Sequence, residues 1–337
     1  MLKLKNDTAK ILKRLNIIAS IFILVLSYFF VCTKLFAKES LTEVLAYLSH
    51  LPNQTLIVPL LILLSLMLLN WSLEAVKWKF LMKKVLSLSF FRSLQSTWLG
   101  VCVGFIFPNR TGDFIGRGFS LPQGYALKGS IATFVGNFAQ GIITLLMGML
   151  GAMFYFFKGH VYQSHVIGGI VCLTLLLLLI VFCLWAYFKI TSFTKFLQRF
   201  NYKWIENLVE KLQFLNEYSV QELLRILFLS WVRYLVFLFQ LYWSIHIFSG
   251  SNDILTVMLL GNFYFLLTTI IPTWVLSEVG VRSSVAILIF GQMNTAWWSL
   301  GLENLFVVAS TIVLWLVNVV IPAIIGSFSV FRLKIFR

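Results

Sequence analysis

Charged side chains are scarce in this sequence. They make up 12% of the 337 residues, whereas hydrophobic residues make up 60% and include 33 Phe. A soluble globule cannot cover its surface with polar groups from such a composition. The scarcity therefore excludes a soluble domain and predicts an all-α polytopic membrane protein.

Cysteine and histidine are also rare, with four residues of each. The cysteines lie in or beside apolar segments, the histidines are scattered, and neither shows a metal-like or redox-like spacing. No nucleophile elbow, zincin helix, P-loop or dinucleotide-binding fingerprint is present. We therefore expect no cofactor, no metal and no enzymatic activity. An intramembrane enzyme that uses Asp113 and Glu278 as acid and base is the alternative.

Acidic residues are rarer than basic ones. The chain has 12 Asp and Glu and 27 Lys and Arg, which gives a net charge of +15. No nucleic-acid-binding motif accompanies this excess, so we expect no nucleic acid among the partners. The basic residues gather beside apolar runs, in residues 3–14, 77–92, 189–225 and 332–337. Such clusters signal topology and contact anionic headgroups. They place both termini in the cytoplasm.

Apolar segments of about 20 residues are long enough to cross the hydrocarbon core. The six that qualify are residues 16–36, 56–76, 131–157, 166–188, 223–248 and 303–327. Two further regions, residues 87–124 and 253–292, are apolar but interrupted by Pro, Gly and charge. The positions of the basic clusters require each interrupted region to enter and leave on one side of the membrane. The prediction is six full spans and two re-entrant helical hairpins that enter from opposite sides, although two full crossings would also suit residues 253–292.

This arrangement predicts one integral membrane domain over residues 1–337, with an amphipathic cytoplasmic linker at about residues 189–222. Broken hairpins in corresponding positions of two halves indicate a transport site near the midplane and a possible inverted repeat. Irregular backbone is tolerated at that depth only beside protein or a water-filled cavity.

The tip of the first hairpin combines a helix break with ionisable side chains. Pro108 ends the incoming helix, Gly112 permits the turn, and a second half-helix is expected to begin near Thr111. Its free amides and dipole favour an anion. Arg110 and Arg117 add guanidinium groups suited to bidentate contact with phosphate.

Each hairpin also carries an acidic residue four positions before an arginine. Asp113 can hold Arg117 in place for a ligand or pair with it only for folding. Glu278 can pair with Arg282 within its helix, or face Arg110 or Arg117 across a cavity and so join the hairpins. The candidate binding residues are Asn109, Arg110, Gly112, Asp113, Arg117, Glu278, Gly280 and Arg282.

Polar side chains at the end of the second span are candidates to support the cavity. Glu74 and Lys77 are expected to line its cytoplasmic mouth. Trp71 and Trp78 are equally explained as interfacial anchors.

Other polar side chains lie within the uninterrupted spans. Asn137 and Gln140 support the cavity or serve helix packing. Arg233, about ten residues into its span, needs Glu278, Asp113 or water as a partner.

Three short motifs of this chain resemble those of the lysylphosphatidylglycerol synthase transmembrane-region family. They are Phe107-Pro-Asn-Arg-Thr-Gly-Asp with Arg117, Glu-x-x-Lys-Trp at residues 74–78, and Pro272 with Gly280-Val-Arg282. That family includes the flippase half of the multiple peptide resistance factor, and the resemblance covers nearly the whole chain. It implies a bacterial or archaeal inner-membrane location and lipid handling.

The chain departs from the family pattern in two respects. Members often have a Gly-rich approach and a Glu after Gly-Val-Arg, whereas this sequence has Thr273-Trp-Val-Leu-Ser-Glu and then Ser283. Glu278 is only a partial substitute for the Glu that family members often have after Gly-Val-Arg. The sequence also contains no aminoacyl-transferase domain, so lipid aminoacylation is not expected.

The function expected from these features is that of a lipid flippase or scramblase. Two arginines and a helix N-terminus predict an anionic headgroup, on a phospholipid or a polyprenyl-phosphate carrier. The alternative is a non-transporting scaffold that presents lipid or glycan precursors to a separate synthase.

Overall fold

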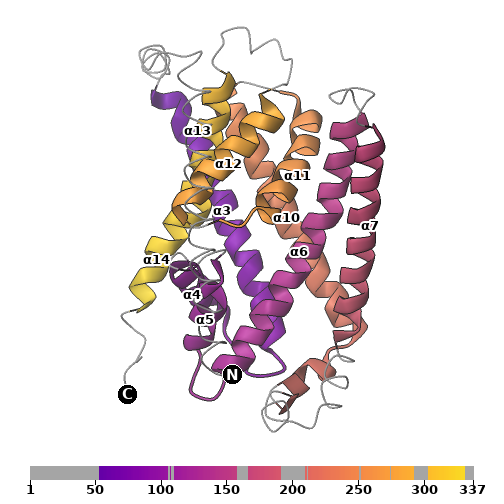
Figure 1. Cartoon of the computed structure of the whole chain (residues 1–337). Coiled ribbons are helices and arrows are strands. Elements are labelled where there is room, and N and C mark those ends of the chain that lie inside the picture. The colour runs from indigo at the N-terminus through magenta and orange to yellow at the C-terminus, as the bar shows by residue number, and fades with distance from the viewer. Residues whose placement is uncertain are drawn as a thin grey trace, which may run out of the picture.

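The computed structural model describes most of the chain as a bundle of helices (Figure 1). The described residues are 53–104, 107, 110–157, 166–190, 209–210, 212–249, 252–273, 275–291 and 303–330. Within these ranges no strand occurs. The predicted span at 16–36, both termini, Pro108, Asn109 and residues 191–208 of the predicted linker lie outside them. The all-helical prediction is confirmed for the described residues.

The long helices of the bundle match the predicted uninterrupted spans. They are α3 (Asn53–Met82), α6 (Ala126–Phe157), α7 (Val166–Phe188), α10 (Val220–Ser249), and α13 (Glu303–Trp315), which continues through the π-helical η5 (Leu316–Val320) into α14 (Ile321–Val330). Among the described residues, four helical stretches are long and apolar enough to cross a membrane, in α3, α6, α7 and α13–α14. A fifth candidate joins α10 to the next helix across a bend of 120°.

The two interrupted regions each form a pair of shorter helices. The first pair is α4 (Phe90–Gly104) and α5 (Gly112–Phe119), and the second is α11 (Ile254–Ile270) and α12 (Val275–Phe290). At 1.5 Å per residue, the 17 residues of α11 extend about 26 Å and the 8 residues of α5 about 12 Å. Both lengths fall short of the hydrocarbon core, which is about 30 Å thick. The pairs lie in opposite halves of the bundle, and each turns in its interior (Figure 1).

Capping side chains fix where two of these helices begin. Ser219 and Glu222 form a capping box at the start of α10, because each side chain accepts a hydrogen bond from the other residue's backbone amide, at 3.2 and 2.9 Å. Asp253 caps α11 by accepting a hydrogen bond from the Thr256 amide at 3.1 Å. α11 follows α10 across the bend of 120° and packs against it.

Close contact between α4 and α5 depends on glycine. A Cβ atom at Gly116 would lie 2.8 Å from the Cα atom of Gly100 and 2.9 Å from the Leu99 carbonyl oxygen. At Gly112 it would lie 2.5 Å from the Val103 carbonyl oxygen. Gly112 was predicted to permit the turn, and the left-handed backbone among the described residues of this turn lies at Arg110, with φ 55°. Gly112 instead lets α5 approach α4.

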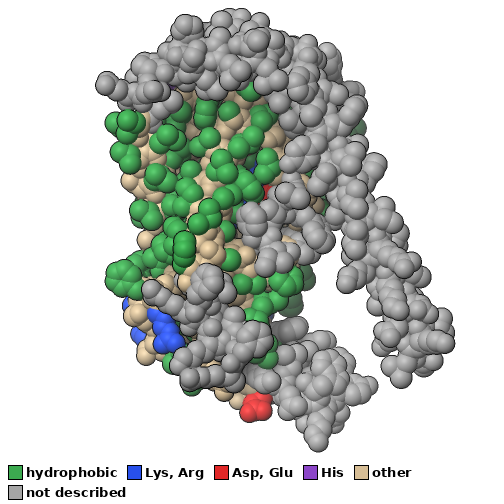
Figure 2. Space-filling model, turned by 90° about the vertical axis from the view of Figure 1, so that its left-hand side faces the viewer, with side chains coloured by type: hydrophobic (Ala, Val, Ile, Leu, Met, Phe, Trp, Pro, Cys, Tyr) green, Lys and Arg blue, Asp and Glu red, His purple; other side chains and the backbone are tan. Residues whose placement is uncertain are grey.

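Large apolar side chains cover the outside of the bundle. Figure 2 shows a broad hydrophobic surface on one face, with Lys and Arg side chains near its lower end. Ile167 and Phe91 are among the many exposed apolar residues, as expected of a surface that faces lipid tails. Near the basic end, Lys84 forms an ion pair with Glu222 at 3.2 Å, which brings the turn after α3 beside the start of α10.

Replacing Gly116 with Ala should destabilise the protein by about 1–3 kcal/mol, because the new methyl group meets backbone atoms that cannot rotate away. The melting temperature in detergent measures this effect. Gly141→Ala is the matched control, since a Cβ at Gly141 has no neighbour within 4 Å. Equal melting temperatures for the two variants would contradict the close packing of α4 and α5.

Candidate functional site

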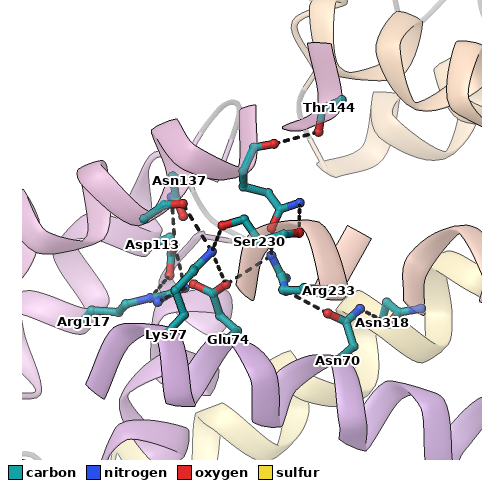
Figure 3. Close-up of polar contacts among 12 residues, drawn as sticks. Asn70, Glu74, Lys77, Asp113, Arg117, Asn137, Thr144, Ser230, Arg233 and Asn318 are labelled. Carbon is teal, nitrogen blue, oxygen red and sulfur yellow. Dashed lines mark hydrogen bonds and ion pairs between the residues drawn. The ribbon is translucent and has the colours of Figure 1, made fainter. Parts of the chain in front are cut away.

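Glu74 of α3 is the centre of a buried network of charges (Figure 3). Its Oε1 atom accepts a hydrogen bond from Nη1 of Arg117 at 2.9 Å. Its Oε2 atom lies 2.8 Å from Nζ of Lys77 and 3.2 Å from Nη1 of Arg233. One carboxylate thus binds three cations and connects α3, α5 and α10.

Asp113 and Arg117 form a two-pronged ion pair within α5. Nε and Nη2 of Arg117 donate to the two carboxylate oxygens of Asp113 at 2.8 and 3.1 Å. Nδ2 of Asn137, on α6, donates to Oδ2 of Asp113 at 3.3 Å. The predicted pairing over one helical turn is confirmed, as is the second half-helix predicted to begin near Thr111, which is α5. Because Arg117 also binds Glu74, this pairing joins α5 to the rest of the bundle.

Arg233 of α10 has a different partner from those predicted. The sequence suggested Glu278, Asp113 or water, but the ion pair is with Glu74. Nε of Arg233 donates to Oδ1 of Asn70 at 2.8 Å, and its Nη1 donates to Oε1 of Gln140 at 3.3 Å. Nε and Nη1 of this guanidinium are therefore both engaged, and they join α10 to α3 and α6.

Aromatic rings complete the surroundings of Arg233. Its guanidinium carbon lies 5.4 Å from the ring centre of Trp71 and 5.2 Å from that of Phe237, within the range of cation–π attraction. Trp71 is buried. It therefore packs inside the protein and does not act as the interfacial anchor that its sequence position suggested.

Lys77 is also deeper than predicted. The side chains of Lys77 and Glu74 are 1% and 2% exposed, so they do not line an open cytoplasmic mouth. Nζ of Lys77 donates to the Gly136 carbonyl at 3.2 Å and to Oγ of Ser230 at 3.5 Å. Trp78 is fully buried and donates to Oγ1 of Thr133 at 3.1 Å. The motif at residues 74–78 thus faces the interior of the bundle.

A chain of side-chain amides extends the network to the last long helix. Nδ2 of Asn70 donates to Oδ1 of Asn318 at 3.3 Å and to Oε1 of Gln240 at 3.5 Å. Sequence reasoning missed Asn318, whose signal was an isolated Asn in an apolar span. Asn318 lies in the π-helical turn η5, and such turns occur often at functional sites.

A second charged cluster links the two short helix pairs. Nη2 of Arg110, just before α5, lies 2.6 Å from Oε1 of Glu278 on α12. Nε of Arg282 donates to the same oxygen at 2.9 Å. Both arrangements considered for Glu278 therefore occur at once, and the link between the two regions is confirmed. The left-handed backbone at Arg110 costs about 1–3 kcal/mol, which indicates that its surroundings hold it there.

The two clusters differ in how accessible their arginines are. Side chains of Arg110 and Arg282 are 35% and 24% exposed, whereas that of Arg117 is 3% exposed. Glu278 itself is buried. Among the described residues, Arg110 and Arg282 form ion pairs only with Glu278. We call the accessible cluster of Arg110, Glu278 and Arg282 the outer triad.

The charged residues of the network around Glu74 form the inner cluster, in which each arginine has several partners. Its members are Glu74, Lys77, Asp113, Arg117 and Arg233. The structure thus brings the described candidate residues into these two clusters or beside them, including Asn137 and Gln140. Gly280 is a buried residue of α12, and Asn109 lies outside the described residues. Among the described side chains, no group of three or more His, Cys, Asp and Glu is placed to hold a metal ion.

Comparison with known proteins gives one match. A family model described as the lysylphosphatidylglycerol synthase TM region matches residues 16–326. No curated protein and no solved structure shows significant similarity to the chain.

Glu74→Gln should destabilise the protein by about 3–5 kcal/mol, because it leaves three buried cations without their shared carboxylate. Unfolding in detergent, followed by loss of the monodisperse peak on heating, measures the effect. Adding Lys77→Met to this variant should recover part of the loss by restoring the original charge of the cluster. Glu222→Gln, at the partly exposed pair with Lys84, is the control and should cost about 1 kcal/mol or less. Equal losses for Glu74→Gln and Glu222→Gln would contradict the role of Glu74.

Proposed function

The chain belongs to the lysylphosphatidylglycerol synthase transmembrane-region family, and from this membership we propose that it is a lipid flippase or scramblase. It moves an anionic headgroup between the leaflets past the outer triad, while the acyl chains stay in the bilayer. The observation that carries this proposal is the pair of partly exposed arginines, Arg110 and Arg282, on one oxygen of Glu278.

Membrane depth makes this arrangement a candidate binding site. Ionisable side chains inside a membrane are costly and commonly mark a substrate pathway. Arg110 and Arg282 come from different short helix pairs, and these turn in the interior of the bundle (Figure 1). We propose that the pairs are re-entrant hairpins from opposite sides, each reaching the middle of the membrane. A headgroup held there is close to both leaflets.

The headgroup competes with Glu278 for the arginines. A guanidinium has five N–H donors in a planar fork, which suits the oxygen atoms of phosphate. A phosphate that takes over Arg110 replaces its ion pair with Glu278 of α12 and so frees the second helix pair to move away from the first. When the headgroup leaves, Glu278 binds both arginines again. This exchange requires no covalent step.

The inner cluster keeps α5 in position while the arginines of the outer triad exchange Glu278 for the headgroup. Arg117 binds Glu74 on α3 and Asp113 on its own helix, so α5 keeps its place when Arg110 changes partner. The exposed apolar surface allows lipid tails to follow from outside. At mid-height of the face in Figure 2, a few acidic and basic side-chain atoms are visible beside the hydrophobic surface.

The remaining features of the proposal concern topology and location. We propose six full spans, including residues 16–36, with both termini in the cytoplasm of a bacterial or archaeal cell. Exposed Lys and Arg near one end of the bundle support this orientation, since such residues favour the cytoplasmic side.

Arg110→Ala and Arg282→Ala should each reduce lipid translocation in proteoliposomes about tenfold or more. A hydrogen bond to a charged group contributes about 1.5–3 kcal/mol, and 1.4 kcal/mol corresponds to a factor of ten. Translocation is measured by dithionite quenching of fluorescent phosphatidylglycerol. Arg225→Ala, which removes an exposed arginine from α10, is the matched control and should keep the wild-type rate.

Melting temperatures separate the binding role of Arg110 from a structural one. Arg117→Ala should lower both stability and translocation, whereas Arg110→Ala should lower translocation with little change in stability. Wild-type rates for Arg110→Ala and Arg282→Ala would remove the mechanism. A wild-type protein that moves no lipid but co-purifies with a lipid or glycan synthase would favour the scaffold role instead.

A further inference from the structure

We infer that the headgroup carries two negative charges, as a terminal phosphate monoester does, and not the single charge of a phosphodiester. This inference rests on the proposed function and narrows its substrate class. It follows from the balance of charges that the described residues place in the two clusters.

The two clusters carry more positive than negative charge. The outer triad contains two arginines and Glu278. The inner cluster contains Lys77, two arginines and only two carboxylates, those of Glu74 and Asp113. Each cluster therefore has one positive charge in excess, and together they have two.

The two excess charges lie close enough to act on one ligand. Arg110 of the outer triad and Asp113 of the inner cluster pack against the same residue of α4, since a Cβ at Gly104 would lie 3.5 Å from the Cβ of Arg110 and 3.4 Å from the Asp113 amide. Arg110 also directly precedes the helix that carries Asp113 and Arg117. Interactions between charges are screened weakly inside a protein that excludes water. An anion at the outer triad is therefore attracted by the inner cluster as well.

A dianion balances this excess, whereas a monoanion leaves one buried positive charge without a counter-charge. Burying an unpaired charge is costly, so the site should discriminate by charge and not only by shape. A zwitterionic headgroup, with no net charge, leaves both positive charges uncompensated.

The geometry of the outer triad, like the balance of charges, favours a phosphate monoester. Arg110 and Arg282 converge on one oxygen atom and approach it from different helices. A phosphate monoester has three terminal oxygen atoms, so each guanidinium can bind two of them. A phosphodiester has only two such oxygens to share between the arginines.

The experiment compares phosphatidic acid with phosphatidylglycerol that has identical acyl chains, each titrated into the full-length protein in neutral nanodiscs. Measurements at pH 8 keep the monoester doubly charged, since the second pKa of such phosphates is about 6. The wild-type protein should bind phosphatidic acid about tenfold more tightly or better, equivalent to about 1.4 kcal/mol. Arg282→Gln removes one positive charge and should bring the ratio of the two affinities close to one.

Glu222→Gln and Arg225→Gln are the controls, because they change charge on α10 outside both clusters. They should keep the wild-type ratio, which excludes an effect of total charge. Equal affinities for the two lipids in the wild-type protein would overturn the inference and leave the proposed function intact. Failure to bind either lipid would overturn both.

Competition by soluble phosphates identifies the source of the headgroup. Glycerol 3-phosphate and inorganic phosphate share the dianionic group but lack acyl chains. They should displace phosphatidic acid only at concentrations about a hundredfold higher, because the acyl chains hold phosphatidic acid in the bilayer and so raise its effective concentration at the site. Displacement at equal concentrations would identify a soluble phosphate as the ligand and overturn the assignment to lipid.

Discussion

Sharing of carboxylates between cations is the constraint on which this structure depends. A lysine or arginine alone inside a lipid-facing bundle would carry a large desolvation cost. Glu74 binds three cations and Glu278 binds two, so five ionised side chains are held by two carboxylates and Asp113. The partners come from α3, α5, α10 and α12. The same interactions that make the charges tolerable therefore hold the helices together.

The inner cluster stabilises the fold, whereas the outer triad is the proposed site of ligand binding. In the inner cluster, Arg117 and Arg233 have several partners each and little exposure. In the outer triad, Arg110 and Arg282 share one oxygen of Glu278 and remain partly exposed. Replacing the carboxylate partner of an arginine costs the least free energy where that arginine has few partners and is partly exposed. The proposed headgroup exchange is accordingly placed at Arg110 and Arg282.

Local patterns in the sequence predicted much of the fold and part of the site. Spans followed from the length of apolar runs, and the Asp113–Arg117 pair followed from its spacing of one helical turn. The helix breaks with nearby charges also located both sides of the Arg110–Glu278 contact, Arg110 in the first interrupted region and Glu278 in the second. Residues 16–36, and whether the broken pairs are re-entrant, are still matters of prediction.

Contacts between distant segments could not be derived in the same way. Glu74 meets Arg117 across 43 positions, and Asn70 meets Asn318 across 248. Nothing in the local sequence distinguishes Glu74, at the centre of a network, from a carboxylate at a span end. The predicted partner of Arg233 was wrong for the same reason, because the rotation of α10 about its own axis decides which carboxylate this arginine faces. The sequence did not indicate that the left-handed backbone lies at Arg110, nor that Gly112 is needed for the contact between α5 and α4.

The most direct test of the account is the distance between the two short helix pairs with and without lipid. Thr111→Cys and Thr273→Cys, in a background without the native cysteines, place one spin label on each helix pair and leave the outer triad intact. Double electron–electron resonance measures the distance between the two labels. The account predicts one distance in lipid-free detergent and a longer one when phosphatidic acid separates the two helix pairs. A distance that phosphatidic acid does not change would contradict it.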